Sequence, residues 1–157
     1  MILIGGVQVM QGYLNDPIKT DTVIKEINGM RWYVTGDKGY LDSNGFLFII
    51  DRYSRFAKVG GEMISLCETE QAISQSLSDP DQEVIVVALP DPKKGEKLVA
   101  LHDSELDKES IKQSLIQRGL SNLALPQSWY QVAELPKLGS GKTDFTAAKV
   151  LAIQCEG

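Results

Sequence analysis

The run Glu83-Val-Ile-Val-Val-Ala-Leu89 decides how most of this chain folds. Its apolar residues are largely β-branched, which favours a buried strand over a helix. Two later stretches, Lys97–His102 and Ser128–Ala133, have the same strand character. The sequence therefore predicts a three-stranded sheet in this part of the chain.

A helix is expected before the first of these strands. Ser65-Leu-Cys-Glu68 has the pattern of a capping box, in which the serine accepts a hydrogen bond from an unpaired helix N–H. Leu66, Ile73 and Leu77 then recur on one face at helical spacing. We expect the helix to end near Ser78-Asp79-Pro80, because proline disfavours helical backbone in the residue before it.

Two further helices are expected after the second strand. Lys108–Arg118 is amphipathic, and Gly119 is suited to end it. Asp144 is suited to cap a last helix that runs through about Ala152. The resulting order of helices and strands predicts a small α+β domain in which helices pack on the sheet.

The part of the chain before this domain is predicted to be β-rich. Residues 30–35 alternate as a strand does, and Asp42-Ser-Asn-Gly45 is a turn signal between Gly39–Leu41 and Phe46–Ile50. A β-hairpin is expected there. The polar stretch Asp51–Phe56 is the candidate boundary between two bodies. Because the chain opens inside an apolar strand-like run, we also expect it to have been cut from a longer protein.

Composition restricts the function. The chain has 157 residues, a net charge of −5 and 43% hydrophobic residues, which suits one domain or one domain plus part of another. The acidic balance argues against nucleic acid, and no apolar run is long enough to span a bilayer. The chain has no metal-ligand pattern, since it has only two cysteines, Cys67 and Cys155, and one histidine, His102. We interpret His102 as structural. A reducing cytoplasmic setting is the simplest interpretation.

Leu138-Gly-Ser-Gly-Lys-Thr143 is the most conspicuous candidate site. A phosphate-binding P-loop needs a glycine six positions before the lysine, and Pro136 stands there, so a P-loop is not expected. On a mobile loop, the ammonium group of Lys142 can be delivered to an oxyanion and then withdrawn. The alternative is a solvent-exposed lysine in a turn.

Two other stretches have candidate ligand-binding residues. Asp37, in Thr35-Gly-Asp37, could accept hydrogen bonds from two vicinal hydroxyls, as acidic residues do with ribose, or could be a turn residue only. The segment 51–61 has several cations before a glycine pair that permits close ligand approach. A phosphate-facing loop and a solvated linker explain these cations equally well: Arg52, Arg55 and Lys58.

Taken in order, four segments resemble motifs of the adenylate-forming superfamily, the acyl- and aryl-CoA synthetases and their relatives. Together they cover nearly the whole chain. They are Gly5–Tyr13, similar to G-x-x-V/M-x-G-Y; Tyr33–Asp37, similar to Y-x-T-G-D; Asp51–Glu70, similar to G-R-x-D…K-x-x-G-x-x-I…E-x-E; and Leu135–Lys142, similar to L-P-K-T-x-x-G-K.

Two stretches, Arg55–Leu66 and Pro136–Phe145, resemble one group of this superfamily more closely. That group is the bifunctional acyl-[acyl-carrier-protein] synthetase/2-acylglycerophosphoethanolamine acyltransferase of bacteria. The resemblance implies that a fatty acid and ATP, with Mg²⁺, form an acyl-adenylate, and that the thiol of acyl carrier protein then displaces AMP. The product would feed lysophospholipid reacylation. A fatty acyl-CoA synthetase that uses coenzyme A is the alternative.

The resemblance also implies a domain organisation. Residues 1–51 would be the C-terminal end of the large adenylation domain, 52–56 a hinge, and 57–157 a C-terminal lid domain that swings between two orientations. The acid pocket, the adenine site and the phosphate loop would lie in the missing N-terminal adenylation domain. We therefore expect the isolated chain to be inactive.

Functional roles follow from the motif positions. Lys142 would approach the carboxylate and the α-phosphate, Asp37 would hold the ribose hydroxyls, and Arg52 would help to hold the nucleotide. The remaining implied assignments are Ser54 at the hinge and Gly60 and Gly61 along the path of the thiol.

The sequence departs from these motifs in the hinge region. Asp51 replaces the usual glycine before Arg52, and Ser54 replaces the usual acidic hinge residue, although serine tolerates turn backbones. A non-catalytic module that binds acidic carrier protein is the alternative from another class. Its basic patch would be formed by Lys93, Lys94 and Lys97.

Overall fold

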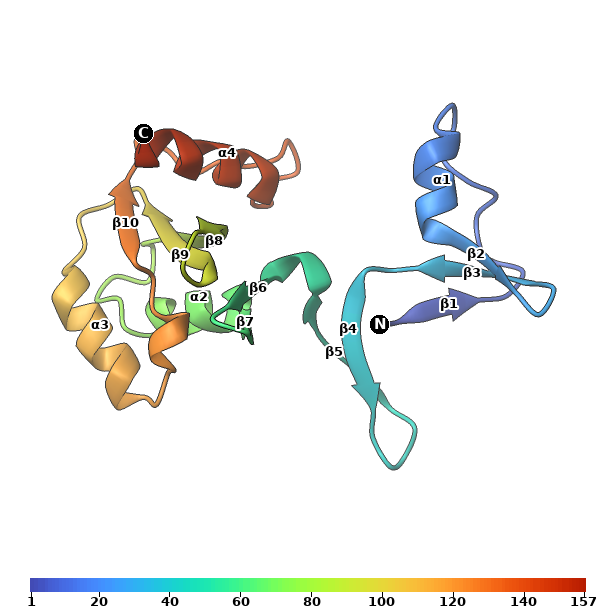
Figure 1. The fold of residues 1–157 in the computed structure, drawn as a ribbon, viewed down its shortest axis with the longest axis horizontal. Coiled ribbons are helices and arrows are strands. Elements are labelled where there is room, and N and C mark those ends of the chain that lie inside the picture. Colours follow the sequence, from blue (N-terminus) through green and yellow to red (C-terminus); the bar gives the residue numbers. More distant parts are fainter. The chain divides into compact units, whose positions relative to one another are not determined.

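A computed structural model describes residues 1–157, which divide into two compact units, Met1–Ser54 and Arg55–Gly157 (Figure 1). Each unit has its own sheet. The second unit has nearly all of the apolar core, and the first has no residue that is fully buried.

The second unit is built on a five-stranded sheet. Its central strand β9 pairs with β8 in antiparallel fashion along its whole length, so β10 and β6 must share the other edge of β9. β10 runs parallel to β9, and β6 forms a hairpin with β7. The strands are β6 Phe56–Val59, β7 Glu62–Ser65, β8 Val84–Asp91, β9 Gly95–His102 and β10 Ser128–Gln131.

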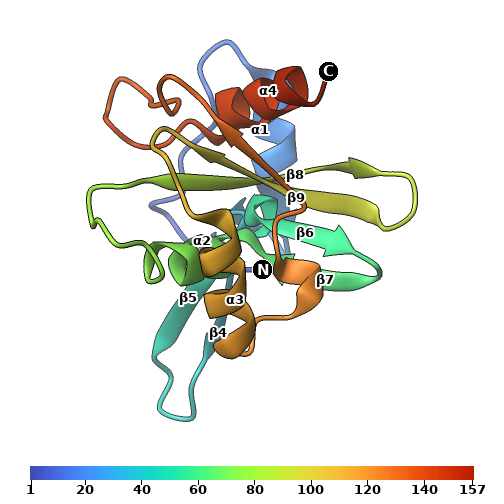
Figure 2. The ribbon, with the colours of Figure 1, turned by 90° about the vertical axis from the view of Figure 1, so that its left-hand side faces the viewer.

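Helices cover both faces of this sheet (Figure 2). Helices α2 (Leu66–Ser74) and α3 (Lys108–Gln117) pack on one face, and α4 (Phe145–Glu156) packs on the other. Successive residues of a strand point to opposite faces, so alternate residues of β8 enter different cores. Val86 packs with α2 and α3, whereas its neighbour Val87 packs with α4. Burial on both faces explains why β8 is apolar without interruption.

Each of these helices begins at a side chain that accepts a hydrogen bond from the first turn. Ser65 Oγ accepts from Glu68 N at 3.1 Å, Asp107 Oδ1 from Ser110 N at 3.1 Å, and Asp144 Oδ1 from Thr146 N and Ala147 N, both at 3.0 Å. The predicted caps Ser65 and Asp144 are therefore confirmed. Gly119, with φ 84°, follows the end of α3 as expected.

The α+β class predicted from the sequence is confirmed, but the sheet is larger than the predicted three strands. Of the two additional strands, β6 lies within residues 51–61, for which the sequence predicts a solvated linker or a phosphate-facing loop, and β7 follows directly after that segment. Each has only four residues, of which two are buried in β6 (Ala57 and Val59) and one in β7 (Ile64), so neither has a long apolar run. Helix α2 is also shorter than predicted: it ends at Ser74, and Leu77 packs on the core from beyond the helix.

The first unit has a three-stranded antiparallel sheet and a separate hairpin. Strand β3 (Met30–Val34) lies between β1 (Leu3–Gly5) and β2 (Ile24–Ile27), and helix α1 (Pro17–Val23) precedes β2. Helix α1 was not predicted. It begins at Asp16, which accepts a hydrogen bond from Lys19 N, and it has proline in its first turn.

The predicted hairpin is present, formed by β4 (Asp37–Leu41) and β5 (Leu47–Arg52). Asp42 Oδ1 closes the turn by accepting hydrogen bonds from Asn44 N at 2.9 Å and Phe46 N at 2.8 Å. Several large apolar side chains of the hairpin are exposed: Tyr40, Leu41, Phe46, Leu47, Phe48, Ile49 and Ile50. No helix of the structure has the length and apolar character needed to cross a membrane.

Candidate functional site

Asp37 and Arg52, the two predicted nucleotide-binding residues, lie side by side on the β4–β5 hairpin. They are directly paired across the strands, and Arg52 Nε lies 3.4 Å from Asp37 Oδ1. The Asp37 side chain is 24% exposed and the Arg52 side chain 72% exposed. The pair therefore presents a carboxylate and a guanidinium next to each other, which suits a ligand with hydroxyl and phosphate groups.

The backbone before Asp37 explains how its carboxylate is held. Gly36 has φ 77°, a conformation that residues with a Cβ rarely adopt. Its carbonyl accepts a hydrogen bond from Tyr53 N at 2.9 Å, which ties this turn to the end of β5. Thr35 Oγ1 accepts from Asp37 N at 3.0 Å and donates to Ile2 O at 3.0 Å. These bonds fix the direction in which β4 leaves the turn.

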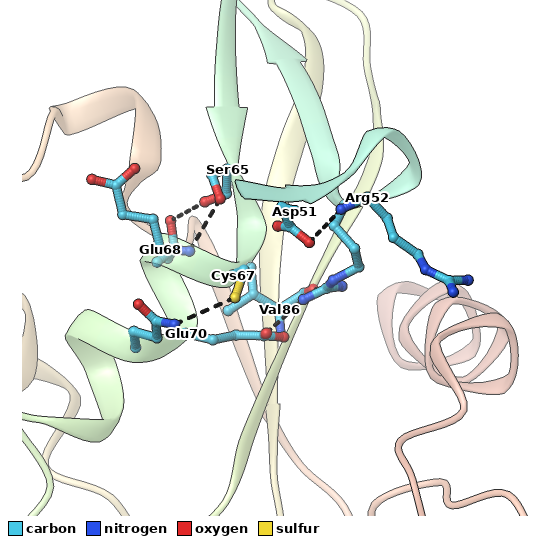
Figure 3. A network of polar contacts seen from close by, with 10 residues as sticks. Asp51, Arg52, Ser65, Cys67, Glu68, Glu70 and Val86 are labelled. Carbon is cyan, nitrogen blue, oxygen red and sulfur yellow. Dashed lines mark hydrogen bonds and ion pairs between the residues drawn. The ribbon is translucent and has the colours of Figure 1, made fainter. Parts of the chain in front are cut away.

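Ser54 lies in the short 3₁₀ helix Tyr53–Arg55 that follows β5, and it is the last residue of the first unit. The expected polar boundary at Asp51–Phe56 therefore contains ordered structure. Asp51 and Arg52 belong to β5, and Asp51 Oδ1 accepts a hydrogen bond from Arg52 N at 2.7 Å (Figure 3).

Gly60 and Gly61 form the two-residue turn of the β6–β7 hairpin. Val59 pairs with Glu62, and the two glycines have φ 61° and 92°. A tight hairpin turn of this kind needs positive φ at both central positions, which glycine adopts without steric cost. A Cβ on Gly61 would meet no atom within 4 Å, so its backbone is open to approach. Gly60 N donates to Lys94 O at 2.8 Å, which ties the turn to the β8–β9 connection.

Lys142 lies on a small closed loop before α4, and its side chain is exposed. Lys137 and Thr143 form an isolated antiparallel bridge at the base of the loop. Within it, Leu138 N donates to Lys142 O at 2.7 Å, and Gly141 N donates to Leu138 O at 2.8 Å. The loop thus has internal order, and Lys142 lies next to its base, directly before the bridge residue Thr143.

The Lys142 loop and the glycine turn lie at opposite ends of the β8–β9 ladder. At one end, Lys137 Nζ lies 2.8 Å from Glu83 Oε2, immediately before β8, and this hydrogen bond raises the pKa of Lys137. At the other end, Lys94 contacts Gly60. Because β8 has 8 residues, the two ends are about 25 Å apart.

Arg55 is the residue whose environment the sequence did not predict. Both interpretations of the cations in residues 51–61 placed them in solvent or against a phosphate, yet Arg55 is only 6% exposed. Its Nη2 lies 2.6 Å from Glu70 Oε2. The one sequence signal for this buried contact was the E-x-E motif, Glu68 and Glu70. Its second carboxylate, that of Glu70, lies on α2 and faces the sheet.

Other candidates have structural settings. His102 is buried, with Nδ1 2.6 Å from Ser104 O, which fits its structural interpretation. Lys97 forms an ion pair with Glu156, so one of the three lysines proposed for a carrier-protein patch has a partner within the chain. The first unit has a cavity of about 260 Å³ lined by Ile4, Gln8, Val9, Met10, Tyr13 and Tyr33. A hydrogen bond with Tyr13 raises the pKa of Tyr33 there.

The donor set of the chain fits part of a nucleotide. Asp37 and Arg52 provide an acceptor for hydroxyls and a donor for phosphate. The structure contains no cluster of three or more His, Cys, Asp or Glu side chains that could hold a metal ion. Mg²⁺ at nucleotide sites is usually held by one or two carboxylates together with the phosphates, so the nucleotide itself would supply part of the coordination of the Mg²⁺ implied by the resemblance.

No family model matches the chain, but the two similar proteins described next are CoA ligases by name. The chain is 36% identical over 143 residues to the 2-succinylbenzoate–CoA ligase of Listeria monocytogenes, covering 90% of the chain and 29% of that protein. It is 32% identical over 145 residues to the long-chain-fatty-acid–CoA ligase of Bacillus subtilis, covering 90% of the chain and 25% of that protein. The chain thus spans less than a third of these relatives.

Solved structures extend the likeness to the fold. The o-succinylbenzoate–CoA synthetase of Bacillus subtilis matches with a TM-score of 0.71 in its complex with AMP, at 28% identity over 94% of the chain and 29% of that protein. Its complex with the acyl-adenylate intermediate matches with a TM-score of 0.74 at 27% identity, over the same shares of the two chains. The predicted resemblance to the adenylate-forming superfamily is confirmed at this level, as is the fold of its C-terminal region.

Proposed function

We propose that this chain is the C-terminal part of an enzyme that activates a carboxylic acid with ATP. The proposal follows from its resemblance to adenylate-forming ligases in sequence and fold. In the first half-reaction, a carboxylate oxygen attacks the α-phosphorus of ATP and pyrophosphate leaves. In the second, a thiol sulfur attacks the acyl carbon of the adenylate, the thiol proton is lost, and AMP leaves. A fatty acid is the acid that the motifs favour.

One observation carries this proposal: the Lys142 loop and the Gly60-Gly61 turn lie at opposite ends of the β8–β9 ladder within a single unit. A rotation of residues 57–157 about a hinge at 52–56 would present one end for adenylation and the other for thiol transfer. Two chemically different steps would then use different faces of one rigid body.

The residues of this chain have distinct roles under the proposal. The ammonium group of Lys142 stabilises the negative charge that the carboxylate and the α-phosphate share in the first step. Asp37 accepts hydrogen bonds from the ribose hydroxyls, and Arg52, held beside it at 3.4 Å, donates to the nucleotide. The open backbone at Gly61 leaves space for a thiol arm in the second step. Ser54 absorbs the change in backbone angles.

The decisive experiment uses the longer enzyme that contains this chain. We expect Lys142→Ala to lower acid-dependent exchange of pyrophosphate into ATP about a hundredfold or more, since removing one such donor costs about 3 kcal/mol. Thioester formation from preformed acyl-adenylate should persist. Lys149→Ala is the matched control, because Lys149 is an exposed lysine on α4. Equal exchange rates in Lys142→Ala and Lys149→Ala would refute the role of Lys142.

The acceptor thiol separates two versions of the proposal. The relatives described above are CoA ligases by name, which favours coenzyme A. The segments Arg55–Leu66 and Pro136–Phe145 instead resemble acyl carrier protein synthetases, so carrier protein remains the second candidate. Supplying each thiol separately to the preformed adenylate and measuring thioester decides between them. The isolated chain, without the rest of the proposed ligase, should release no pyrophosphate from ATP in the presence of either thiol.

A further inference from the structure

Arg55 is a buried cation within the proposed hinge segment 52–56, and it forms three different contacts. Its side chain is 7% exposed and forms an ion pair with Glu70, whose own side chain is 17% exposed. Its Nη1 donates to Val86 O at 3.0 Å. Its guanidinium carbon lies 3.8 Å from the centre of the Phe145 ring. A residue next to Ser54 in sequence is thus joined to α2, β8 and α4.

The contacts with Val86 replace a missing strand. β9 occupies one edge of β8, and no strand occupies the other. There Glu70 Oε1 accepts from Val86 N at 2.7 Å, as Figure 3 shows, while Arg55 donates to Val86 O. The ion pair therefore satisfies both backbone groups of this residue, as a neighbouring strand would. Buried backbone groups without partners are costly, so this arrangement holds the Arg55 side chain in one place.

The third contact reaches the segment that carries Lys142. Phe145 is the first residue of α4, three residues after Lys142, and its side chain is 40% exposed. Asp144, between them, caps the helix and donates its N–H to Pro136 O at 2.9 Å. The C-terminal end of the loop is therefore continuous with a rigid helix whose first side chain rests on the guanidinium face.

A guanidinium is suited to all three contacts at once. Its edge donates several hydrogen bonds in one plane, and its face stacks on an aromatic ring. Lysine could replace the charge toward Glu70 but has no planar face for Phe145. The other end of the loop is held by the Lys137–Glu83 pair, whose side chains are 45% and 53% exposed. Exposed ion pairs contribute little, so the Arg55 contact is the firmer of the two.

We propose that Arg55 is a positioning residue that holds the Lys142 loop in place by stacking on Phe145. The proposal rests on the proposed function, since it assumes that Lys142 takes part in adenylation. Arg55 itself would touch neither substrate nor nucleotide. Its effect would be to keep the ammonium group of Lys142 within reach of its target each time the unit turns, which limits the conformations that the loop must search.

Phe145→Leu removes the ring that stacks on Arg55 and so tests the positioning role. It carries little risk to folding, because Phe145 is partly exposed. Amide hydrogen exchange in the longer enzyme should become about fivefold faster or more in residues 137–144, as expected for losing a cation–π contact, while β8 and β9 stay protected. The kcat of adenylation should fall by a similar factor, with thioester formation from preformed adenylate unchanged. Phe145→Tyr, which keeps the ring, should restore both values.

Arg55→Lys is the second variant, because it retains the charge beside Glu70 and removes the planar face. It should reproduce the faster exchange in residues 137–144. Unchanged exchange in both Phe145→Leu and Arg55→Lys would overturn the proposal. So would normal adenylation by Phe145→Leu in an enzyme that Lys142→Ala inactivates. If the loop loosens but Lys142→Ala also adenylates normally, the anchor is supported and the proposed function is the part refuted.

Discussion

The two units use similar strands but bury them to very different extents. In the second unit, β8 and β9 lie between helices, and residues such as Val86 and Leu98 have no exposed surface. In the first unit, the β4–β5 hairpin also contains several large apolar residues, yet Phe46 is 68% and Ile49 65% exposed. Within the hairpin, Tyr40 stacks on Phe48, with ring centroids 5.3 Å apart.

This difference shows that an apolar strand pattern predicts burial but does not tell which part of the protein buries the strand. The second unit supplies its own helices to cover its sheet, so its pattern and its burial agree. The hairpin of the first unit has no such cover within residues 1–54. Under the proposed function, in which this chain is the C-terminal part of a longer ligase, the rest of that ligase would cover the hairpin.

The largest expected effect is in the core of the second unit. Ile73 is fully buried between α2 and the sheet, so Ile73→Ala should lower the free energy of unfolding of this chain by about 2–5 kcal/mol. Urea denaturation followed by circular dichroism measures it. A loss below about 1 kcal/mol would mean that the second unit is as loosely packed as the first.

A smaller effect is expected at the start of α4. Asp144→Ala removes the acceptor for Thr146 N and Ala147 N and should destabilise the second unit by about 1 kcal/mol. Asp144→Asn keeps an acceptor oxygen and serves as the control. Equal stability of all three proteins in urea would show that solvent replaces the cap without cost.

An ion pair at the C-terminal end of α4 should make the stability of the second unit depend on pH. The hydrogen bond to Lys97 lowers the pKa of Glu156 below its ordinary value of 4.5, and the same contact raises the pKa of Lys97 above 10.5. The carboxylate contributes stability above pH 4.5 that is lost as pH falls through its folded pKa. The ammonium contributes stability below pH 10.5 that is lost as pH rises through its folded pKa.

Glu156→Gln should therefore destabilise the second unit by about 0.5–1 kcal/mol near neutral pH. The difference from wild type should shrink in acid and in strong alkali. Unfolding midpoints measured in urea across the pH range test this. A difference that stays constant at all pH values would assign the effect to packing instead of charge.

The smallest effect is expected in the exposed hairpin. In this chain alone, Ile49→Thr should change stability by less than about 0.5 kcal/mol, because Ile49 is already largely in water. In the longer enzyme the same change should cost more, since the inferred cover would then bury Ile49. Equal effects in the two proteins would contradict the inference that the rest of the ligase covers this hairpin.

Sequence reasoning succeeded where pattern and burial arise within one short segment. The strands β8 to β10, the caps Ser65 and Asp144 and the hairpin turn at Asp42 all depend on neighbouring residues. It missed β6 and β7 because each has only four residues, with two buried positions in β6 and one in β7. It missed α1 because that helix has no buried residue and thus no apolar stripe.

The candidate site divides in the same way. One hairpin brings Asp37 and Arg52 near each other, but the register at the turn alone would pair Asp37 with Asp51. A bulge between Lys38 and Gly39 shifts the register by one residue, so that Asp37 faces Arg52. The burial of Arg55 depends on Glu70, Val86 and Phe145, which are distant in sequence and meet only in the folded unit. No local pattern distinguishes such an arginine from a solvated one.

The many partners of β9 have a consequence for the order in which the chain folds. β9 forms a local hairpin with β8, but Val59 must find Gly95, and Ser128 must find Val99, across long intervening segments. Pairings of this range raise the contact order and slow folding. During synthesis, the β8–β9 hairpin can therefore form early, but the sheet stays incomplete until β10 has left the ribosome. The face of β8 and β9 that α4 covers stays exposed longer still, until α4 has also left the ribosome.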